Sequence, residues 1–119
     1  MRGYRDLKVW QLGFDISLAV YELTSDFPQS ELYGPTSQLR RAAVSIPSNI
    51  AEGHSRSSTK DLIRFINMAK GSLAELETQL LIARSLGYCN SSKIDGILEL
   101  VDEQSRMLSG YRRSLKEQL

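Results

Sequence analysis

The sequence has few of the residues that build disulfides and metal centres. It contains one cysteine, Cys89, and one histidine, His54. A single cysteine excludes an intrachain disulfide framework, and a His/Cys metal site needs more ligands than these residues can supply. No glycine-rich phosphate-binding loop is present either. We therefore expect no metal and no cofactor.

A long apolar run is also missing. A membrane-spanning helix needs about 20 consecutive, mostly apolar residues, and no stretch of the sequence comes near this. The first residues, MRGYRDLKVWQ, reach charged and polar side chains before an apolar signal region could form. We therefore expect a cytoplasmic protein in a reducing compartment, with no membrane partner.

The charge is nearly balanced, with a formal net charge of +1 at pH 7. Nucleic-acid-binding domains are usually more basic, so the placement of the charges matters more than their sum. The 119 residues contain no linker, low-complexity segment or internal repeat. This length and uniformity predict a single domain over residues 1–119.

The first helical pattern, at about residues 6–26, has two apolar stripes where one would complete a monomer core. One stripe consists of Leu7, Trp10, Phe14 and Tyr21, and the other of Val9, Ile16, Val20 and Leu23. The surplus apolar surface predicts self-association.

Three further helical patterns follow. Residues 35–53 carry an apolar line, with Pro35 suited to the first helical position and Gly53 to the C-terminal stop. The third begins after Ser58, which has capping-box spacing to Asp61, and continues with a seven-residue seam to Gly87. The fourth is predicted to start at Ser92, with Asp95 in the same spacing. Because short turns join these helices and nothing is typical of a strand, we predict an all-α, up-down-up-down four-helix bundle.

The segment RAAVSIPSNIAEG, residues 41–53, combines an apolar helical face with a polar one and with a proline. Polar side chains recur three or four residues apart at Gln38, Arg41, Ser45, Ser48 or Asn49, and Glu52. Pro47 removes the bond that its N–H would give to the Ala43 carbonyl, a loss of about 3 kcal/mol inside a helix. We expect the hydroxyls of Ser45 or Ser48, or water, to satisfy that carbonyl.

Two interpretations of this stripe predict different proteins. As a catalytic site, it would use Ser45 as nucleophile, Glu52 as acid or base and His54 as proton carrier, but no nucleophile elbow or second histidine accompanies them. As a packing seam, it would supply hydrogen bonds within or between bundles, which is the interpretation we favour.

Other reactive residues are weaker candidates. Cys89 has no histidine or basic cluster nearby in sequence and is predicted to be an inert thiol. Glu75 and Glu77 lack the Glu-x-x-His partners of a di-iron bundle. Trp10 could stack on a base, but its helical spacing with Leu7 and Phe14 favours the core.

Four segments carry a family resemblance: LKVWQ at residues 7–11, QLRRAAVSIPSNIAEG at 38–53, GSLAELETQL at 71–80 and LGY at 86–88. They resemble the four-helix-bundle proteins of the intervening sequences in bacterial 23S rRNA genes, also labelled S23 ribosomal proteins. The resemblance covers almost the whole chain. Its most specific block carries over onto the following residues: Ser45, Ile46, Pro47, Ser48, Asn49, Ile50, Ala51, Glu52 and Gly53.

The resemblance implies a left-handed up-down-up-down bundle, commonly a homopentamer around a central channel, with no established enzyme activity. The family is also similar to the accessory variability proteins of diversity-generating retroelements. Those proteins are pentameric, strongly basic and associated with reverse transcriptase and nucleic acid. The present chain differs from them in its nearly neutral charge.

Topology and charge together predict a molecule polarised along its axis. In an up-down-up-down bundle, one pole gathers the start of the first and third helices and the end of the second and fourth. There the sequence places Arg2, Arg5, Lys8, His54, Arg56, Lys60, Arg64, Arg112, Arg113 and Lys116, opposed mainly by Asp6, Glu52, Asp61 and Glu117. The opposite pole has Glu22, Asp26, Glu31, Asp95 and Glu99 against Arg84 and Lys93.

These observations leave the function open among three classes. The leading hypothesis is a non-enzymatic, homo-oligomeric module that contacts RNA or DNA as an accessory to a nucleic-acid enzyme. The family resemblance alone implies that the oligomer is a pentamer. Its candidate contacts are the basic side chains of the first pole, which could equally be ordinary solvated helix ends. The second hypothesis is a purely protein-binding scaffold, and the third is a hydrolase.

Overall fold

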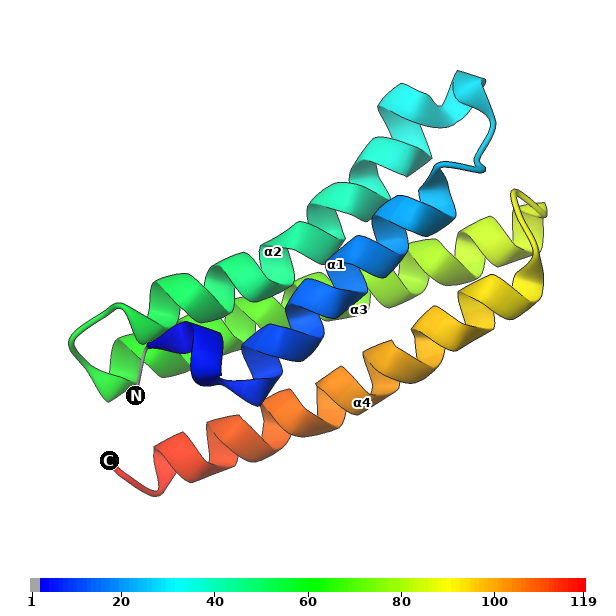
Figure 1. Cartoon of the computed structure of the whole chain (residues 1–119). Coiled ribbons are helices and arrows are strands. Elements are labelled where there is room, and N and C mark those ends of the chain that lie inside the picture. Colours follow the sequence, from blue (N-terminus) through cyan, green and yellow to red (C-terminus); the bar gives the residue numbers. More distant parts are fainter. Residues whose placement is uncertain (1–2) are drawn as a thin grey trace.

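The computed structural model describes residues 3–119, and four long helices account for most of them (Figure 1). The helices are α1 (Lys8–Thr24), α2 (Ser37–His54), α3 (Thr59–Leu86) and α4 (Ser91–Lys116). A 3₁₀ helix, η1 (Tyr4–Asp6), precedes α1, and the α1–α2 connection contains η2 (Gln29–Glu31) and the π-helical turn η3 (Leu32–Thr36). No strand occurs within residues 3–119.

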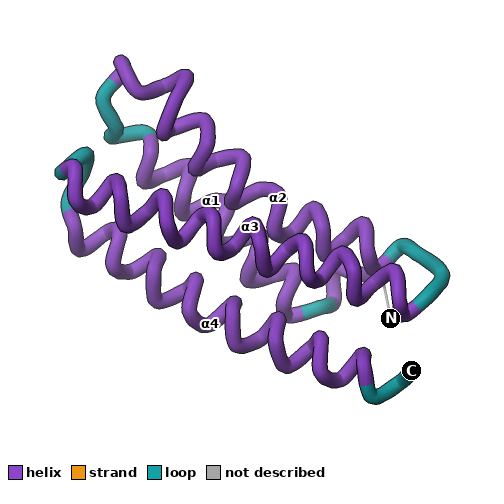
Figure 2. The backbone as a smooth tube through the Cα atoms, turned by 180° about the vertical axis from the view of Figure 1, so that it is seen from behind, coloured by secondary structure: helices purple, strands orange, loops and turns teal. Residues whose placement is uncertain are grey.

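Each long helix packs against two others and reverses the direction of the one before it (Figure 2). α1 and α3 each contact both α2 and α4, and the most extensive contact is between α2 and α3. The bundle measures 46 × 22 × 21 Å, which is little more than the length of α3, about 42 Å at 1.5 Å per residue. The predicted all-α, up-down-up-down four-helix bundle is confirmed.

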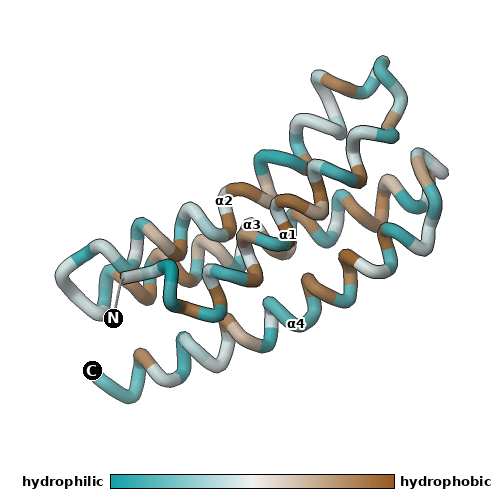
Figure 3. The backbone as a smooth tube through the Cα atoms, viewed as in Figure 1, coloured by the Kyte–Doolittle hydropathy of each residue, from teal (hydrophilic) through white to brown (hydrophobic). Residues whose placement is uncertain are grey.

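The core is an apolar column that all four helices line. Figure 3 shows apolar stretches recurring along each of them. The largest fully buried apolar side chains are Ile16, Val20, Leu39, Ile46, Ile50, Ile66, Leu76, Leu80, Ile94 and Leu108. The two predicted stripes of α1 have different fates. The stripe through Ile16 and Val20 is buried, whereas Phe14 and Tyr21 of the other stripe remain 45% and 46% exposed.

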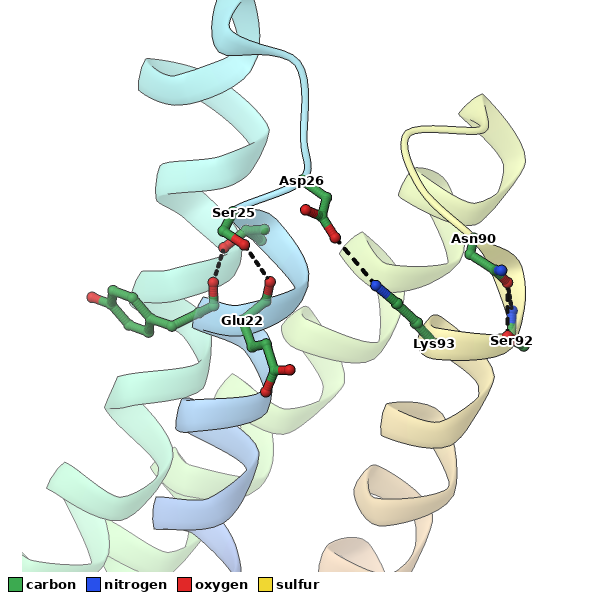
Figure 4. Close-up of polar contacts among 8 residues, drawn as sticks. Glu22, Ser25, Asp26, Asn90, Ser92 and Lys93 are labelled. Carbon is green, nitrogen blue, oxygen red and sulfur yellow. Dashed lines mark hydrogen bonds and ion pairs between the residues drawn. The ribbon is translucent and has the colours of Figure 1, made fainter.

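The ends of α3 follow the prediction, but the start of α4 does not. Ser58 accepts a hydrogen bond from the Asp61 amide at 3.1 Å, and Gly87 ends α3 with a left-handed φ of 71°. α4 begins at Ser91, and its cap is Asn90, whose Oδ1 accepts from the Ser92 amide at 2.8 Å (Figure 4). The predicted Ser92 cap was wrong because asparagine, an equally good cap, precedes it by two residues.

The predicted ends of α2 were also displaced. Pro35 lies in η3, before α2 begins at Ser37, and Gly53 lies inside the helix, which continues to His54. Gly53 is needed for another reason. A Cβ at this position would lie 2.6 Å from the Cβ of Phe65, closer than real Cβ atoms approach. Glycine therefore permits the contact between α2 and α3 rather than ending α2.

None of the helices formed by residues 3–119 is both long enough and apolar enough to cross a bilayer.

Candidate functional site

The segment RAAVSIPSNIAEG on α2, residues 41–53, contains the specific family block and has a buried apolar face and an outward polar face. We call this segment the block. Ala43, Ile46 and Ile50 are fully buried. On the outward face, the Ser45 hydroxyl donates to the Ala42 carbonyl at 2.9 Å, and the Asn49 amide donates to the Ser45 carbonyl at 2.8 Å. These polar groups bond to the backbone of α2, so their role within one bundle is local to the helix.

Pro47 is accommodated by a hydroxyl of the neighbouring helix. The Ser17 Oγ of α1 donates to the Ala43 carbonyl at 3.1 Å, the acceptor that Pro47 leaves without its usual donor. Ser17 also approaches the Gly13 carbonyl at 3.0 Å, so its proton is shared between the two. A hydroxyl was correctly predicted, but Ser45 and Ser48 were the wrong donors, because Ser17 faces the freed carbonyl from across the α1–α2 contact.

An open groove runs along the outer side of α1 and α2. Its larger part, about 620 Å³, reaches from Tyr21 to Tyr33 and includes Arg41, Ser45 and Ser48 of the block. A second part of about 330 Å³ shares Val44 and Ser48 with the first. We call both parts together the α1/α2 groove. The polar face of the block thus lies along a continuous surface depression.

Aromatic side chains line the α1/α2 groove. The Trp10 ring lies 5.3 Å from Tyr4 and 5.3 Å from Phe14, centroid to centroid. Tyr33 is 94% exposed. Trp10 is half-buried, so its predicted core position is correct only in part, because its ring contacts the core and also lines the groove. The α1/α2 groove is therefore lined by the exposed outer stripe of α1 and by the adjoining outward face of α2.

Two arginines border this apolar surface. The Arg40 guanidinium lies 4.7 Å from the Tyr21 ring centroid, and its Nε donates to Thr24 Oγ1 at 2.9 Å. Arg41 lines the same part of the groove and is exposed. A ligand of this groove would meet aromatic faces flanked by positive charge.

The predicted basic pole is assembled by the fold. Figure 1 places η1, the α2–α3 connection and the end of α4 at the same end of the bundle. The described candidates at this end are Arg5, Lys8, Arg56, Lys60, Arg64, Arg112, Arg113 and Lys116. Arg2, which was also predicted as a contact, lies outside the described residues.

The α2–α3 part of this pole is largely neutralised. Arg56 pairs with Glu52 at 3.0 Å, and Arg64 pairs with Asp61 at 3.7 Å. Both guanidinium groups also lie over the Phe65 ring, at 5.0 and 4.7 Å from its centroid. These two arginines therefore have intramolecular partners that a phosphate would have to replace.

The α3–α4 part carries positive charge without such compensation. The Lys70 ammonium donates to Ser109 Oγ at 2.6 Å, and Arg112 donates to Asn67 Oδ1 at 2.9 Å. Partial burial lowers the pKa of Lys70, and the positive charges of Arg112 and Lys116 lower it further. We call Lys70, Arg112 and Lys116 the α3/α4 basic cluster.

Both cations that were predicted at the opposite pole form ion pairs. Lys93 pairs with Asp26 at 3.2 Å between the start of α4 and the end of α1 (Figure 4). Arg84 pairs with Asp95, the residue that was predicted to complete the α4 cap. These pairs are exposed, so each contributes at most about 1 kcal/mol to stability.

The residues considered for catalysis do not form one site within the described part of the chain. The Ser45 hydroxyl is bonded to Ala42, while Glu52 pairs with Arg56. Cys89 is half-buried, and burial, followed by the Asp26 carboxylate, raises the pKa of its thiol. This shift disfavours the nucleophilic thiolate. Residues 3–119 bring together no group of His, Cys, Asp or Glu that could hold a metal ion.

Comparison with known proteins identifies the family. The family model described as "23S rRNA-intervening sequence protein" matches residues 5–110. The chain belongs to this family. A crystal structure of a protein of unknown function from the S23 ribosomal protein family of Bacteroides thetaiotaomicron superimposes with a TM-score of 0.78. It is 20% identical, and the match covers 87% of this chain and 97% of that one, which supports the fold alone. No curated protein matches the chain.

Sequence reasoning missed two residues that the fold makes prominent. Lys70 lies in the middle of α3 in sequence, far from the segments that define the basic pole, and only its contact with Ser109 brings it to α4. Tyr33 falls in the α1–α2 connection, which was interpreted as a simple turn. A helical projection that aligned Asn67 and Lys70 on one side of α3 would have been the only available signal.

Proposed function

We propose that this protein is a non-enzymatic, self-assembling helical-bundle module that presents a basic surface to RNA or DNA. The observation that carries the proposal is the α1/α2 groove, where Phe14, Tyr21 and Val44 remain exposed in a single chain. Exposed apolar surface of this kind favours association because water is released when it is covered.

The groove is best covered by a second copy of the same chain. Its aromatic lining has the composition of an interface core, and its arginine border that of an interface rim. Heterologous contacts repeated around an axis form a ring when the rotation between copies closes, and the family resemblance suggests five copies. In a parallel ring the basic poles would gather on one face, where they could hold a nucleic-acid backbone.

Assembly is tested with Phe14→Glu and Val44→Glu, which change exposed positions of the groove. The matched control is Met68→Glu on α3, because Met68 is 46% exposed and Phe14 45%. Light scattering at micromolar concentration should show an oligomer for the unchanged protein and the control, and smaller species for the groove variants. A monomeric unchanged protein, or groove variants that assemble normally, would refute this part of the proposal.

Nucleic-acid binding is tested on the unchanged protein by titrating salt against a single-stranded RNA and a DNA of the same sequence. Phosphate contacts release counterions, so log affinity should fall linearly with log salt. Absence of binding at low salt would favour the second candidate, a protein-binding scaffold. In that case the α1/α2 groove would bind a partner protein, such as a nucleic-acid enzyme.

A further inference from the structure

We propose that the α3/α4 basic cluster is the phosphate-contacting site of this protein, and that its ligand is the phosphodiester backbone of a nucleic-acid strand. The inference rests on the proposed nucleic-acid function and deepens it by assigning the contacts. It moves them away from Arg56 and Arg64, and it adds Lys70, which the charge pattern along the sequence did not mark.

The cluster is held between two helices by neutral groups. Lys70 Nζ donates to Ser109 Oγ at 2.6 Å, and Arg112 Nη1 donates to Asn67 Oδ1 at 2.9 Å, so each contact joins α3 to α4. Each of these bonds uses one lone pair of the oxygen that accepts it. The Ser109 hydroxyl proton and the Asn67 amide protons remain as donors. A surface that adds these donors to two positive charges is complementary to an anion with several oxygen acceptors, such as a phosphate.

The charges in the cluster have no internal counterion. Every ion pair among the described residues lies elsewhere, and none involves Lys70, Arg112 or Lys116. Burial is the main cause of the lowered pKa of Lys70, and the positive charges of Arg112 and Lys116 add to it. Like charges in one cluster repel one another, and a bound phosphate would relieve the repulsion.

Helix stabilisation explains only part of this arrangement. Lys116 lies in the last turn of α4, where a cation interacts favourably with the helix dipole. Lys70 is in the interior of α3, which spans Thr59–Leu86, and gains nothing from either helix end. Its ammonium is brought toward two other cations by the fold, which costs free energy unless an anion is bound.

The shape of the site favours a strand over a small phosphate compound. Arg112 and Lys116 are four residues apart on α4, so their backbones are separated by about 6 Å along the helix axis. Lys70 faces them from α3, and Lys116 is exposed. Cations spaced along a helix in this way suit successive phosphates of a chain, since Arg can bind one bidentately and Lys acts as a point charge.

The test compares Lys70→Gln/Arg112→Gln with Arg84→Gln/Lys93→Gln. Each pair removes one lysine and one arginine, and each changes one residue of α3 and one of α4. The control residues lie beside the α3–α4 connection, away from the cluster. Binding to a single-stranded RNA and a DNA of the same sequence is measured over a salt series. Inorganic phosphate alone is added as a competitor to distinguish a strand site from a small-anion site.

We expect the cluster variant to bind roughly tenfold more weakly at low salt, with a slope of log affinity against log salt that is less negative by about 1.4, since each contact on a single strand contributes ~0.7. The control should bind as the unchanged protein does. Lys70→Arg/Arg112→Lys keeps both charges and should retain most of the slope. Inorganic phosphate should compete only weakly.

If the unchanged protein binds but the cluster variant keeps its affinity and slope, the inference is overturned while the proposed function stands. An equal loss in the control variant would also overturn it, because general charge would then suffice. Absence of binding by the unchanged protein overturns both, and strong competition by inorganic phosphate overturns the choice of a strand. Should the cluster variant fail to fold, as judged by circular dichroism, Arg112→Gln/Lys116→Gln at the end of α4 carries the same prediction.

Discussion

Replacing Gly53 by alanine should destabilise the protein even though alanine is the better helix former. Gly53 lies inside α2, so alanine would normally gain roughly 0.5–1 kcal/mol there. The added Cβ, however, would lie 2.6 Å from Phe65 Cβ and 3.1 Å from Leu62 Cδ1. The Phe65 Cβ is fixed to the α3 backbone, so relief requires the helices to separate.

Overpacking of this kind typically costs about 1–3 kcal/mol. After subtracting the helix gain, we expect Gly53→Ala to lower the free energy of unfolding by about 0.5–2 kcal/mol. For a chain of this size, that corresponds to a fall in Tm of about 4 °C for each kcal/mol. The matched control is Gly71→Ala in α3, where an added Cβ meets nothing within 4 Å. The control should be stabilised by about 0.5–1 kcal/mol.

The measurement is urea unfolding followed by circular dichroism, at one protein concentration for all variants because assembly makes stability depend on concentration. The two substitutions are chemically identical and should change stability in opposite directions. If Gly53→Ala is as stable as Gly71→Ala, close approach of α2 and α3 at Gly53 is not what requires glycine.

Three further predictions concern Pro47, Cys89 and the α4 cap. Ser17→Ala should lower the free energy of unfolding by about 1–2 kcal/mol, because the Ala43 carbonyl loses its donor. In a Pro47→Ala background the cost should be about 1 kcal/mol smaller, because the restored N–H of residue 47 donates to that carbonyl. Equal costs in both backgrounds, measured by urea unfolding, would contradict this. Asp26→Asn should lower the pKa of Cys89 and speed its alkylation by iodoacetamide at mildly alkaline pH. Lys93→Gln should raise the pKa of Cys89 and slow the same reaction. Shifts of the same sign in the two pH–rate profiles would refute the electrostatic cause. Asn90→Ala should destabilise the protein by about 1 kcal/mol and Ser92→Ala by less, because the Asn90 side chain accepts from the α4 backbone. A larger loss of Tm for Ser92→Ala than for Asn90→Ala would identify Ser92 as the cap.

Periodicity and turn chemistry were sufficient to predict the four helices and their order, but for α1 they offered two apolar stripes without deciding which one is buried. These signals are local: an apolar face recurring every three or four residues needs a core, and short connections force neighbouring helices to alternate in direction. Ser58 and Gly87 marked the ends of α3 for the same reason, since caps act on the backbone beside them. The family resemblance and the charge difference between the two poles were likewise readable along the chain.

Tertiary packing decided what each polar residue of the candidate sites does. Gly53 looked like a helix end from its sequence, yet the approach of Phe65 from α3 is what excludes a side chain there. Pro47 needed a hydroxyl that sequence neighbours were expected to provide, but Ser17 of α1 provides it. Lys70 joined Arg112 only when α3 and α4 were placed side by side. A hydrogen bond or a repulsion between helices depends on distances of a few ångströms across the bundle, and local periodicity specifies which face turns inward but not which atoms meet.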